Sequence, residues 1–291
     1  MNQPVRKAVI LAAGLGTRFF PMTKVIPKPM LPILNKPVIQ YLVEEVLASG
    51  IQEIIIVTGF GKRSIEEHFD PNYELEQDLI QRGKGELLHE LHTIEESVHL
   101  AYVPQLEAKG DGHALLCAKD FLGSEPFAVL FGDDIIDGPR PALAQLLDVY
   151  AQTGAPVLCT ERVPKANISS YGVISPGTVT GRQIQVTGLV EKPRAEDAPS
   201  DLGIVGKYIC TPDVLEALAR SQSSQPDGEI RLIDGLRTLL SEGKPIYALE
   251  VEGTRYDTGT PWGLLQANMA FAQKDAELRE RMQEFLQKGG E

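Results

Sequence analysis

The chain has few cysteines, no long apolar run and, over its first 43 residues, no acidic side chain. Its three cysteines, Cys117, Cys159 and Cys210, are too few and too widely spaced for a disulfide framework or a zinc site of paired cysteines. They are typical of a protein of the reducing cytoplasm. The opening apolar run, residues 8–13, is too short for a signal peptide or a membrane span.

Charge is distributed unevenly along the chain. Asp and Glu number 40 against 28 Lys and Arg, and the net charge of -12 argues against nucleic-acid binding and against an anionic membrane surface. Residues 1–43 nevertheless contain six basic residues, so this segment predicts one local anion site. The alternative is a basic face exposed to solvent. The six are Arg6, Lys7, Arg18, Lys24, Lys28 and Lys36.

Short apolar runs alternate with helical periodicity in the first half of the chain. The runs have the pattern of buried parallel strands and cover residues 7–13, 53–59, 98–103 and 127–131. Helical stretches are expected at 37–49, 62–68, 74–96, 112–118 and 141–152. This alternation predicts an α/β fold with a doubly wound, mixed and mostly parallel sheet.

The second half contains strand-like runs separated by turn signals, and fewer helices than the first half. Strands are expected at 157–162, 173–175, 184–191 and 206–210, and helices at 212–219, 231–241 and 274–287. No repeat and no low-complexity linker divides the chain, so residues 1–291 are expected to form a single domain.

A glycine-rich loop, Gly14-Leu-Gly16-Thr-Arg18, follows the first strand directly. Glycines at such a position let backbone N–H groups approach a phosphate. A dinucleotide-binding fingerprint would need glycine where Phe19 stands and an acidic residue about 20 positions later, and both are missing. This disfavours a nicotinamide-dependent oxidoreductase, the alternative that a test with NADH would exclude. A P-loop fails too, because Ile56 occupies the position of its first glycine.

The segment from Pro21 to Pro37 contains five prolines and is expected to be stiff and extended rather than helical. It carries Lys28, which together with Arg18 would make a clamp for a triphosphate. Nucleotidyl transfer needs such fixed cationic donors, because the protein contributes mainly positioning and charge stabilisation. The alternative is an ordinary proline-rich surface loop.

Two acidic residues are candidates for a magnesium site. Asp133 stands at the carboxyl end of the apolar strand 127–131, the edge where α/β sheets bind ligands. Carboxylates there suit Mg²⁺, which usually takes one or two of them together with substrate phosphates. Asp257 precedes a helix, and on sequence alone it could equally be a turn residue or a helix cap. Asp134 and Asp137 are read as loop residues.

The motifs together resemble a known family. Ala-Gly-Leu-Gly-Thr-Arg from residue 13, Lys-Val-Ile-Pro-Lys from residue 24, and Glu191-Lys-Pro are similar to the bacterial UTP–glucose-1-phosphate uridylyltransferases of the sugar-nucleotidyltransferase superfamily. The resemblance covers roughly residues 7–272 and implies a Rossmann-like nucleotidyltransferase fold with an added sugar-binding subdomain. It implies that UTP and glucose 1-phosphate react, with Mg²⁺, to UDP-glucose and pyrophosphate. It further implies a homo-oligomer, either a dimer or a tetramer.

The resemblance also implies roles for individual residues. Residues 1–155 would be mainly the nucleotide-binding half, 156–260 mainly the sugar-binding half, and 261–291 a C-terminal helical segment. The nucleotide-binding residues would be Ala12, Ala13, Gly14, Gly16, Thr17, Arg18, Gln105 and Gly110. The sugar-phosphate-binding residues would be Gly172, Glu191, Lys192, Gly203 and Val205. Arg18, Lys28 and Asp133 would be catalytic, Asp133 and Asp257 would hold the metal, and His113 would be structural.

Four positions depart from the family pattern, namely Pro29, Gly132, Arg231 and Thr258. Gly-Asp at the metal strand and Asp-Thr-Gly at 257–259 resemble the thymidylyltransferase branch instead. Transfer of a thymidylyl group, or use of another sugar 1-phosphate, therefore stays an alternative. So does a regulatory paralogue with weak catalysis, which a pyrophosphate-release assay would distinguish.

Overall fold

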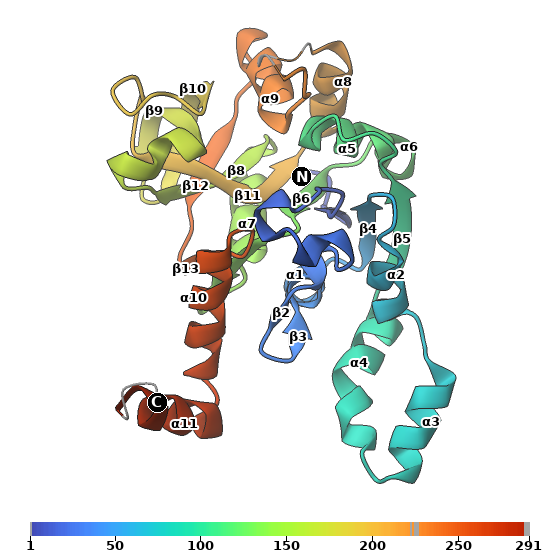
Figure 1. Cartoon of the computed structure of the whole chain (residues 1–291). Coiled ribbons are helices and arrows are strands. Elements are labelled where there is room, and N and C mark those ends of the chain that lie inside the picture. Colours follow the sequence, from blue (N-terminus) through green and yellow to red (C-terminus); the bar gives the residue numbers. More distant parts are fainter. Residues whose placement is uncertain (1, 222, 224–226, 288–291) are drawn as a thin grey trace.

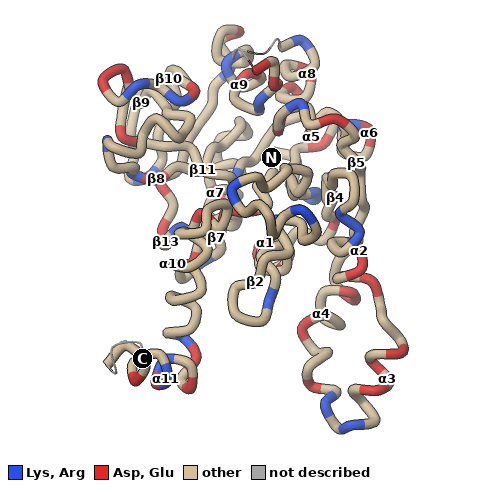
Figure 2. The backbone as a smooth tube through the Cα atoms, in the orientation of Figure 1, with Lys and Arg blue, Asp and Glu red and all other residues tan. Residues whose placement is uncertain are grey.

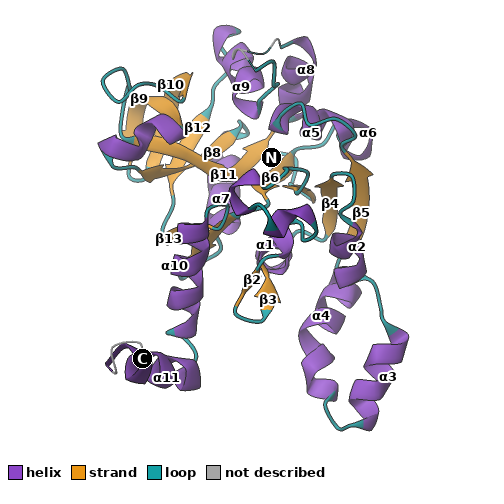
Figure 3. Ribbon diagram, viewed as in Figure 1, coloured by secondary structure: helices purple, strands orange, loops and turns teal. Residues whose placement is uncertain are grey.

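One large twisted sheet runs through the molecule, with helices on both of its faces (Figures 1 and 3). The computed structural model describes residues 2–221, 223 and 227–287. The nine strands lie in the order β5 (His99–Pro104), β4 (Glu53–Thr58), β1 (Lys7–Leu11), β6 (Phe127–Phe131), β11 (Leu202–Cys210), β8 (Val157–Arg162), β12 (Tyr247–Glu250), β10 (Gln183–Glu191) and β9 (Gly172–Thr180). The α/β fold is therefore confirmed.

The sheet is mixed, and its parallel strands are concentrated in the first half of the chain. β5, β4, β1 and β6 are parallel to one another, as the apolar runs predicted. β11 is antiparallel to both of its neighbours, β6 and β8, and joins the two halves of the chain into one sheet. The carboxyl ends of β1, β4 and β6 thus meet at one edge, where the glycine loop and Asp133 follow.

Alternate residues of β1 show how the two layers of helices are built. Ala8 and Ile10 pack into one apolar cluster, whereas Val9 packs into the other. The first cluster lies under α1 (Val38–Ala48), α2 (Arg63–Phe69), α4 (His89–Ser97) and α7 (Ala142–Thr153). The second lies under α5 (Asp111–Cys117), α6 (Lys119–Leu122), α8 (Pro212–Arg220) and α9 (Leu232–Ser241).

The prediction of one continuous helix over residues 74–96 is wrong. The chain there forms a helical arm that turns back on itself. α3 (Tyr73–Gln81) ends where the Lys84 N–H donates to the Leu79 carbonyl, a closure common at helix ends. A 3₁₀ turn, Gly85–Leu88, then leads into α4. Acidic side chains are frequent along this arm, which projects from the sheet (Figure 2).

The proline-rich segment is compact rather than extended. It contains 3₁₀ turns at Met22–Lys24 and Lys28–Met30, and the hairpin strands β2 (Pro32–Ile33) and β3 (Lys36–Pro37). Another 3₁₀ turn, Thr17–Phe19, precedes it. Proline fixes φ near a value that extended chain and 3₁₀ turns share, so counting prolines could not distinguish the two.

A second small sheet, β7 (Asp134–Asp137) with β13 (Thr254–Asp257), was missed. Asp134 and Asp137 are therefore strand residues, and their interpretation as loop residues is wrong. The antiparallel register places Asp257 opposite Asp134 and hence next to Asp133. Two segments more than 100 residues apart thus bring both predicted metal ligands together.

The chain ends in α10 (Pro261–Ala272) and α11 (Ala276–Gln287), which extend away from the sheet (Figure 1). α11 matches the helix expected at 274–287. Among the described helices, none combines the length and apolar character needed to cross a membrane. All three cysteines are free thiols.

Candidate active site

The glycine loop presents backbone N–H groups that the protein itself does not use. The Ala12 N–H continues the sheet by donating to the Val57 carbonyl, at 2.8 Å. Within the described residues, the N–H groups of residues 13–16 have no hydrogen-bond acceptor. Gly16 has a φ of 66°, a left-handed conformation that favours glycine, and its carbonyl accepts a 2.8 Å hydrogen bond from the Thr23 hydroxyl. The hydrogen bond from Thr23 thus fixes the loop, while the N–H groups of residues 13–16 are available to a ligand.

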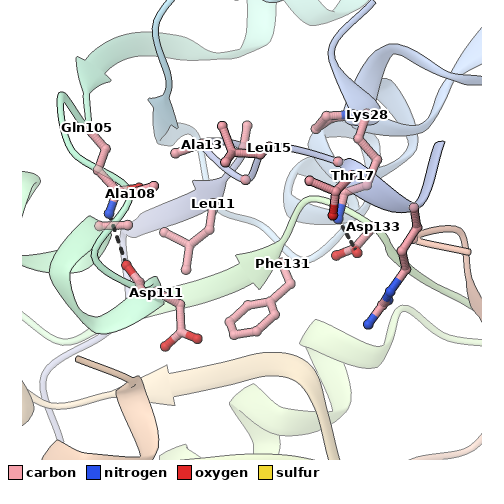
Figure 4. A pocket seen from close by; sticks show the side chains of 18 of the residues that line it. Leu11, Ala13, Leu15, Thr17, Lys28, Gln105, Ala108, Asp111, Phe131 and Asp133 are labelled. Atoms are coloured by element: carbon pink, nitrogen blue, oxygen red, sulfur yellow. Dashed lines mark hydrogen bonds and ion pairs between the residues drawn. The ribbon is translucent and has the colours of Figure 1, made fainter. Parts of the chain in front are cut away.

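A cavity of about 510 Å³ lies over this loop (Figure 4). All eight residues expected to bind the nucleotide line it, together with Lys28 and Asp133. Figure 4 shows the Lys28 side chain pointing toward Asp133, with which it forms an ion pair. The sequence-based grouping of the loop, Lys28 and Asp133 therefore corresponds to one cavity.

Gln105 is a buried side chain at the far side of this cavity, 8% exposed. Its amide nitrogen donates to the Gly110 carbonyl at 3.0 Å and lies 3.0 Å from His113 Nδ1. These contacts fix the amide and leave its oxygen without a hydrogen-bond partner among the described residues. His113 thus contacts Gln105, and its structural role stays a prediction.

A second cavity, of about 330 Å³, adjoins the first and contains most of the predicted sugar-site residues. Gly172, Glu191, Lys192 and Asp257 line it. The predicted Gly203 and Val205 do not line it, whereas their neighbours on β11 do, because alternate residues of a strand face opposite sides. Those neighbours are Ile204, Gly206 and Tyr208. The two cavities share Arg18, Asp111, Phe131, Asp133 and Glu229.

The sugar cavity is bounded by a cluster of opposite charges around Glu191. The Glu191 carboxylate is 11% exposed and lies 3.7 Å from Lys192 Nζ and 3.7 Å from Arg231 Nε. Arg231 in turn forms ion pairs with Asp227 at 2.5 Å and Glu229 at 3.0 Å. The departure at Arg231 thus places a guanidinium directly beside the carboxylate expected to bind hexose hydroxyls. Lys192 has a φ of 45°, so the backbone turns sharply there.

Asp133 and Asp257 face each other across the backbone of Gly259. A side-chain carbon at position 259 would overlap the Asp133 carboxylate and lie 2.9 Å from Asp257 Oδ1, so only glycine fits between them. Thr258 ties the two segments together, because its hydroxyl donates to the Asp133 carbonyl at 2.8 Å. Its departure from the family pattern therefore has a structural role.

The electrostatics of this pair suit a divalent cation. Burial raises the pKa of Asp257 above its ordinary value, and the nearby carboxylates of Asp134 and Asp133 raise it further. A cation between Asp133 and Asp257 would relieve this repulsion. No cluster of three or more potential metal ligands occurs in the described parts of the chain, so remaining ligands would come from phosphate and water.

Arg255 forms ion pairs with two further carboxylates of this acidic region. Its guanidinium lies 2.5 Å from Asp134 Oδ1 and 2.8 Å from Glu161 Oε1, and it also donates to the Tyr171 hydroxyl at 3.0 Å. The other Asp134 oxygen accepts from the Gly206 N–H at 2.8 Å. The ion pair therefore connects the β7–β13 sheet with β11 and β8.

The departures at Pro29 and Gly132 are in contact with each other. Pro29 is buried in the turn that carries Lys28, and its ring lies against Gly132. The Gly132 N–H donates to the Leu11 carbonyl at 3.0 Å, a bond that a proline at this position could not make. The two substitutions thus form one alternative way of packing Lys28 next to Asp133.

Two further residues were missed by sequence reasoning. Asp111 lies between the two cavities, and one of its oxygens accepts from the Leu232 N–H at 2.6 Å. Burial, with Glu191 nearby, raises the pKa of Asp111 to about 6. Lys62 contacts the glycine loop from the neighbouring strand end. Its only signal in the sequence is the dipeptide Gly61-Lys62, which does not belong to a P-loop because Ile56 stands where the first glycine would be.

Comparison with known proteins agrees with this geometry. Residues 7–274 match the nucleotidyl transferase family. The chain is 46% identical over 283 residues to a UTP–glucose-1-phosphate uridylyltransferase of Bacillus subtilis, covering 97% of this chain and 96% of that protein. A crystal structure of a UDP-glucose pyrophosphorylase complexed with UDP-glucose is 39% identical with a TM-score of 0.85, covering 93% of this chain and 100% of that one.

A UTP-bound UGPase from Acinetobacter baumannii is 35% identical with a TM-score of 0.88, and the match covers 97% of this chain and 98% of that one. Sequence and fold thus agree over almost the whole length, and the matched region includes both cavities. The chain accordingly belongs to the nucleotidyl transferase family, among its UTP–glucose-1-phosphate uridylyltransferases.

Proposed function

We propose that this protein transfers a uridylyl group from UTP to glucose 1-phosphate, giving UDP-glucose and pyrophosphate. One observation carries the proposal beyond family membership. The loop cavity and the sugar cavity meet, and Arg18 and Asp133 line both. A nucleotide in one cavity and a sugar phosphate in the other would therefore bring their phosphates together at these two residues, as in-line displacement requires.

The nucleotide would lie on the glycine loop. The N–H groups of residues 13–16 would donate to it, and the free oxygen of Gln105 would accept from the N3–H edge of uracil. Gly110, whose carbonyl holds the Gln105 amide, borders the same end of the cavity. Thymine presents the same edge, so discrimination between UTP and dTTP depends on the space around the C5 and 2′ positions.

The sugar phosphate would lie in the second cavity. Glu191 would accept hydrogen bonds from hexose hydroxyls, with Arg231 fixing its carboxylate, and Lys192 would contact the phosphate. Gly172 contributes open backbone beside Glu191. Gly203 and Val205 stay predictions, and any contact from them would be through the backbone of β11.

The chemical step needs no general base, because a phosphate monoester is already a nucleophile at neutral pH. Its oxygen would attack the α-phosphorus, and the bond to the β-phosphate bridging oxygen would break as pyrophosphate leaves. Arg18 and Lys28 would stabilise the negative charge that develops on the phosphates. Asp133 and Asp257 would hold Mg²⁺, which supplies charge neutralisation and a template for the phosphate oxygens.

The division of the chain follows from the same placement. We propose that residues 1–155 act mainly on the nucleotide and 156–260 mainly on the sugar, with β11 of the second half completing the sheet of the first. Residues 261–291 form the C-terminal helical segment, of which 288–291 lie outside the described residues. A dimer or tetramer, and a place in the reducing cytoplasm in keeping with the free thiols, belong to this proposal too.

The decisive test is pyrophosphate release over a matrix of nucleoside triphosphates and sugar 1-phosphates, with the Asp133→Asn variant as the inactive control. The proposal expects UTP with glucose 1-phosphate to react fastest and to yield UDP-glucose. A preference for dTTP would instead favour the thymidylyl alternative. No turnover with any pair would favour a regulatory paralogue and contradict the proposal.

A further inference from the structure

Lys62 contacts the glycine loop but is not among the residues that line the cavity. It stands between β4 and α2, and its ammonium donates to the Ala12 carbonyl at 2.5 Å and to the Gly14 carbonyl at 2.6 Å. These two bonds draw the carbonyls of alternate loop residues toward Lys62. The peptide units between them are held in one orientation, with the N–H groups of residues 13–16 left free.

The charge of Lys62 has no carboxylate partner. In the part of the chain that the structure describes, no Asp or Glu forms an ion pair with it, and its hydrogen bonds go to the two carbonyls. Burial, reinforced by the positive charge of Lys28, lowers the pKa of Lys62 to about 8. An ammonium has three donors, so one N–H stays available after the two carbonyls are satisfied.

Two more deeply buried cations differ from the half-buried Lys62 in having carboxylate partners. Lys207 is fully buried and meets Glu45 at 2.7 Å, and Arg255 meets both Asp134 and Glu161. Of these three cations, Lys62 is the one without an ion pair to a described carboxylate, and the charge that acts on it is that of Lys28. A desolvated cation without an anion is costly, and such a site is stabilised when a polyanion binds nearby.

We propose that Lys62 is a nucleotide-positioning residue, which holds the glycine loop in its open orientation and whose uncompensated charge favours a nucleoside triphosphate on that loop. This inference rests on the proposed function, since it assigns UTP to the loop cavity. It adds a third cation, from outside the basic segment 1–43, to Arg18 and Lys28. Its role is distinct from theirs, because its contacts are with the loop backbone.

The test compares UTP affinity, by titration calorimetry with Mg²⁺ present, for the wild type, Lys62→Met, Lys62→Arg and the control Lys84→Met. Lys84 is an exposed lysine at the tip of the helical arm, so its loss removes an equal charge far from the loop. We expect Lys62→Met to weaken UTP binding about 10- to 100-fold, the effect of a lost charge-assisted hydrogen bond. Lys62→Arg should recover affinity to within about 3-fold of the wild type, since it keeps the charge and donors.

Thermal unfolding without ligand separates this role from a purely structural one. Lys62→Met should unfold close to the wild-type temperature, because the gain from removing an unpaired cation offsets the loss of its two hydrogen bonds, while the rise in unfolding temperature produced by UTP should be smaller than in the wild type. Unchanged UTP affinity in Lys62→Met would overturn the proposal. The proposal would also be overturned if Lys62→Met and Lys62→Arg lost UTP affinity to the same extent and were both less stable than the wild type without ligand. If the wild type itself failed to bind UTP, the proposed function would fail as well, whereas the other outcomes leave that function intact.

Discussion

Arg255 holds two carboxylates directly below the predicted metal site, and its replacement gives a stringent test of how that site is supported. Its side chain is 11% exposed, that of Asp134 7% and that of Glu161 30%. In Arg255→Met, Asp134 would keep its charge in a buried position without an ion-pair partner, because the neighbouring Lys207 donates to the Asp134 backbone carbonyl and pairs with Glu45. Glu161 is open enough to regain water.

The expected loss follows from this difference in burial. Removing one partner of a buried ion pair costs about 3–5 kcal/mol, mainly because the remaining charge is left desolvated. We therefore expect Arg255→Met to lower the free energy of unfolding by about that amount. In Asp134→Asn/Arg255→Met the buried charge is absent, while the amide oxygen can still accept from the Gly206 N–H. The double variant should recover about 2 kcal/mol of the loss.

Urea unfolding of the wild type, both single variants and the double variant measures these free energies. Circular dichroism and intrinsic fluorescence must give coincident transitions, since a chain of this length can unfold through intermediates. Arg162→Met is the matched control. Arg162 also pairs with two carboxylates, Asp201 and Glu250, but its side chain is 60% exposed, so its loss should leave the urea midpoint unchanged.

The reasoning would be refuted if the double variant were as unstable as the sum of the single variants predicts. Additivity would mean that Asp134 and Arg255 contribute independently and that no stranded charge explains the loss. A loss from Arg162→Met as large as that from Arg255→Met would refute it as well, because burial would then not be the deciding factor.

Further predictions concern the chemistry and the pH dependence of stability. Lys28→Ala and Asp133→Asn should each lower kcat for pyrophosphate release at least ~100-fold, and near-normal turnover in either would remove that residue from the mechanism. Chelation by EDTA should abolish turnover and excess Mg²⁺ should restore it; persisting turnover would contradict a metal at Asp133 and Asp257. The pKa of Asp111 is raised to about 6, so between about pH 4 and pH 6 the folded state holds a proton that the unfolded state has released. The free energy of unfolding therefore falls as pH rises through this range. The advantage of Asp111→Asn over the wild type in urea unfolding should therefore grow by about 2–3 kcal/mol between pH 4 and pH 7, and a constant difference would contradict the shift.

The sheet was predictable because each buried strand leaves a local signal. The runs at 7–13, 53–59 and 127–131 are apolar on both faces, and a strand covered by helices on both faces requires that pattern. The β7–β13 sheet left no such signal. Its strands have four residues each and pair across more than 100 residues, so only the register of the folded chain brings Asp257 beside Asp134.

The parts of the candidate site that depend on the backbone and on the direction of the strands were predictable from the sequence. The glycine loop and Asp133 follow adjacent parallel strands, and their meeting at one edge follows from topology alone. Other charged side chains that line the cavities could not be found in this way. Asp111 and Arg231 act through neighbours that lie near in space and far in sequence, such as Leu232 for Asp111 and Glu191 for Arg231.

The basic segment 1–43 shows why charge along a sequence differs from charge at a site. Lys7 lies 3.5 Å from Glu125 and Lys36 lies 2.9 Å from Glu44, so folding neutralises these two lysines with carboxylates from later segments. Arg18 forms no ion pair with the described residues, and Lys62, from outside the segment, joins it near the loop. Near the loop, Arg18 and Lys62 are left without an ion pair to any described carboxylate, whereas Lys28 is paired with Asp133. We therefore expect Lys7→Met to change the salt dependence of UTP affinity far less than Lys62→Met does. The number of basic residues along the sequence would predict the opposite, because Lys7 belongs to the basic segment 1–43 and Lys62 does not.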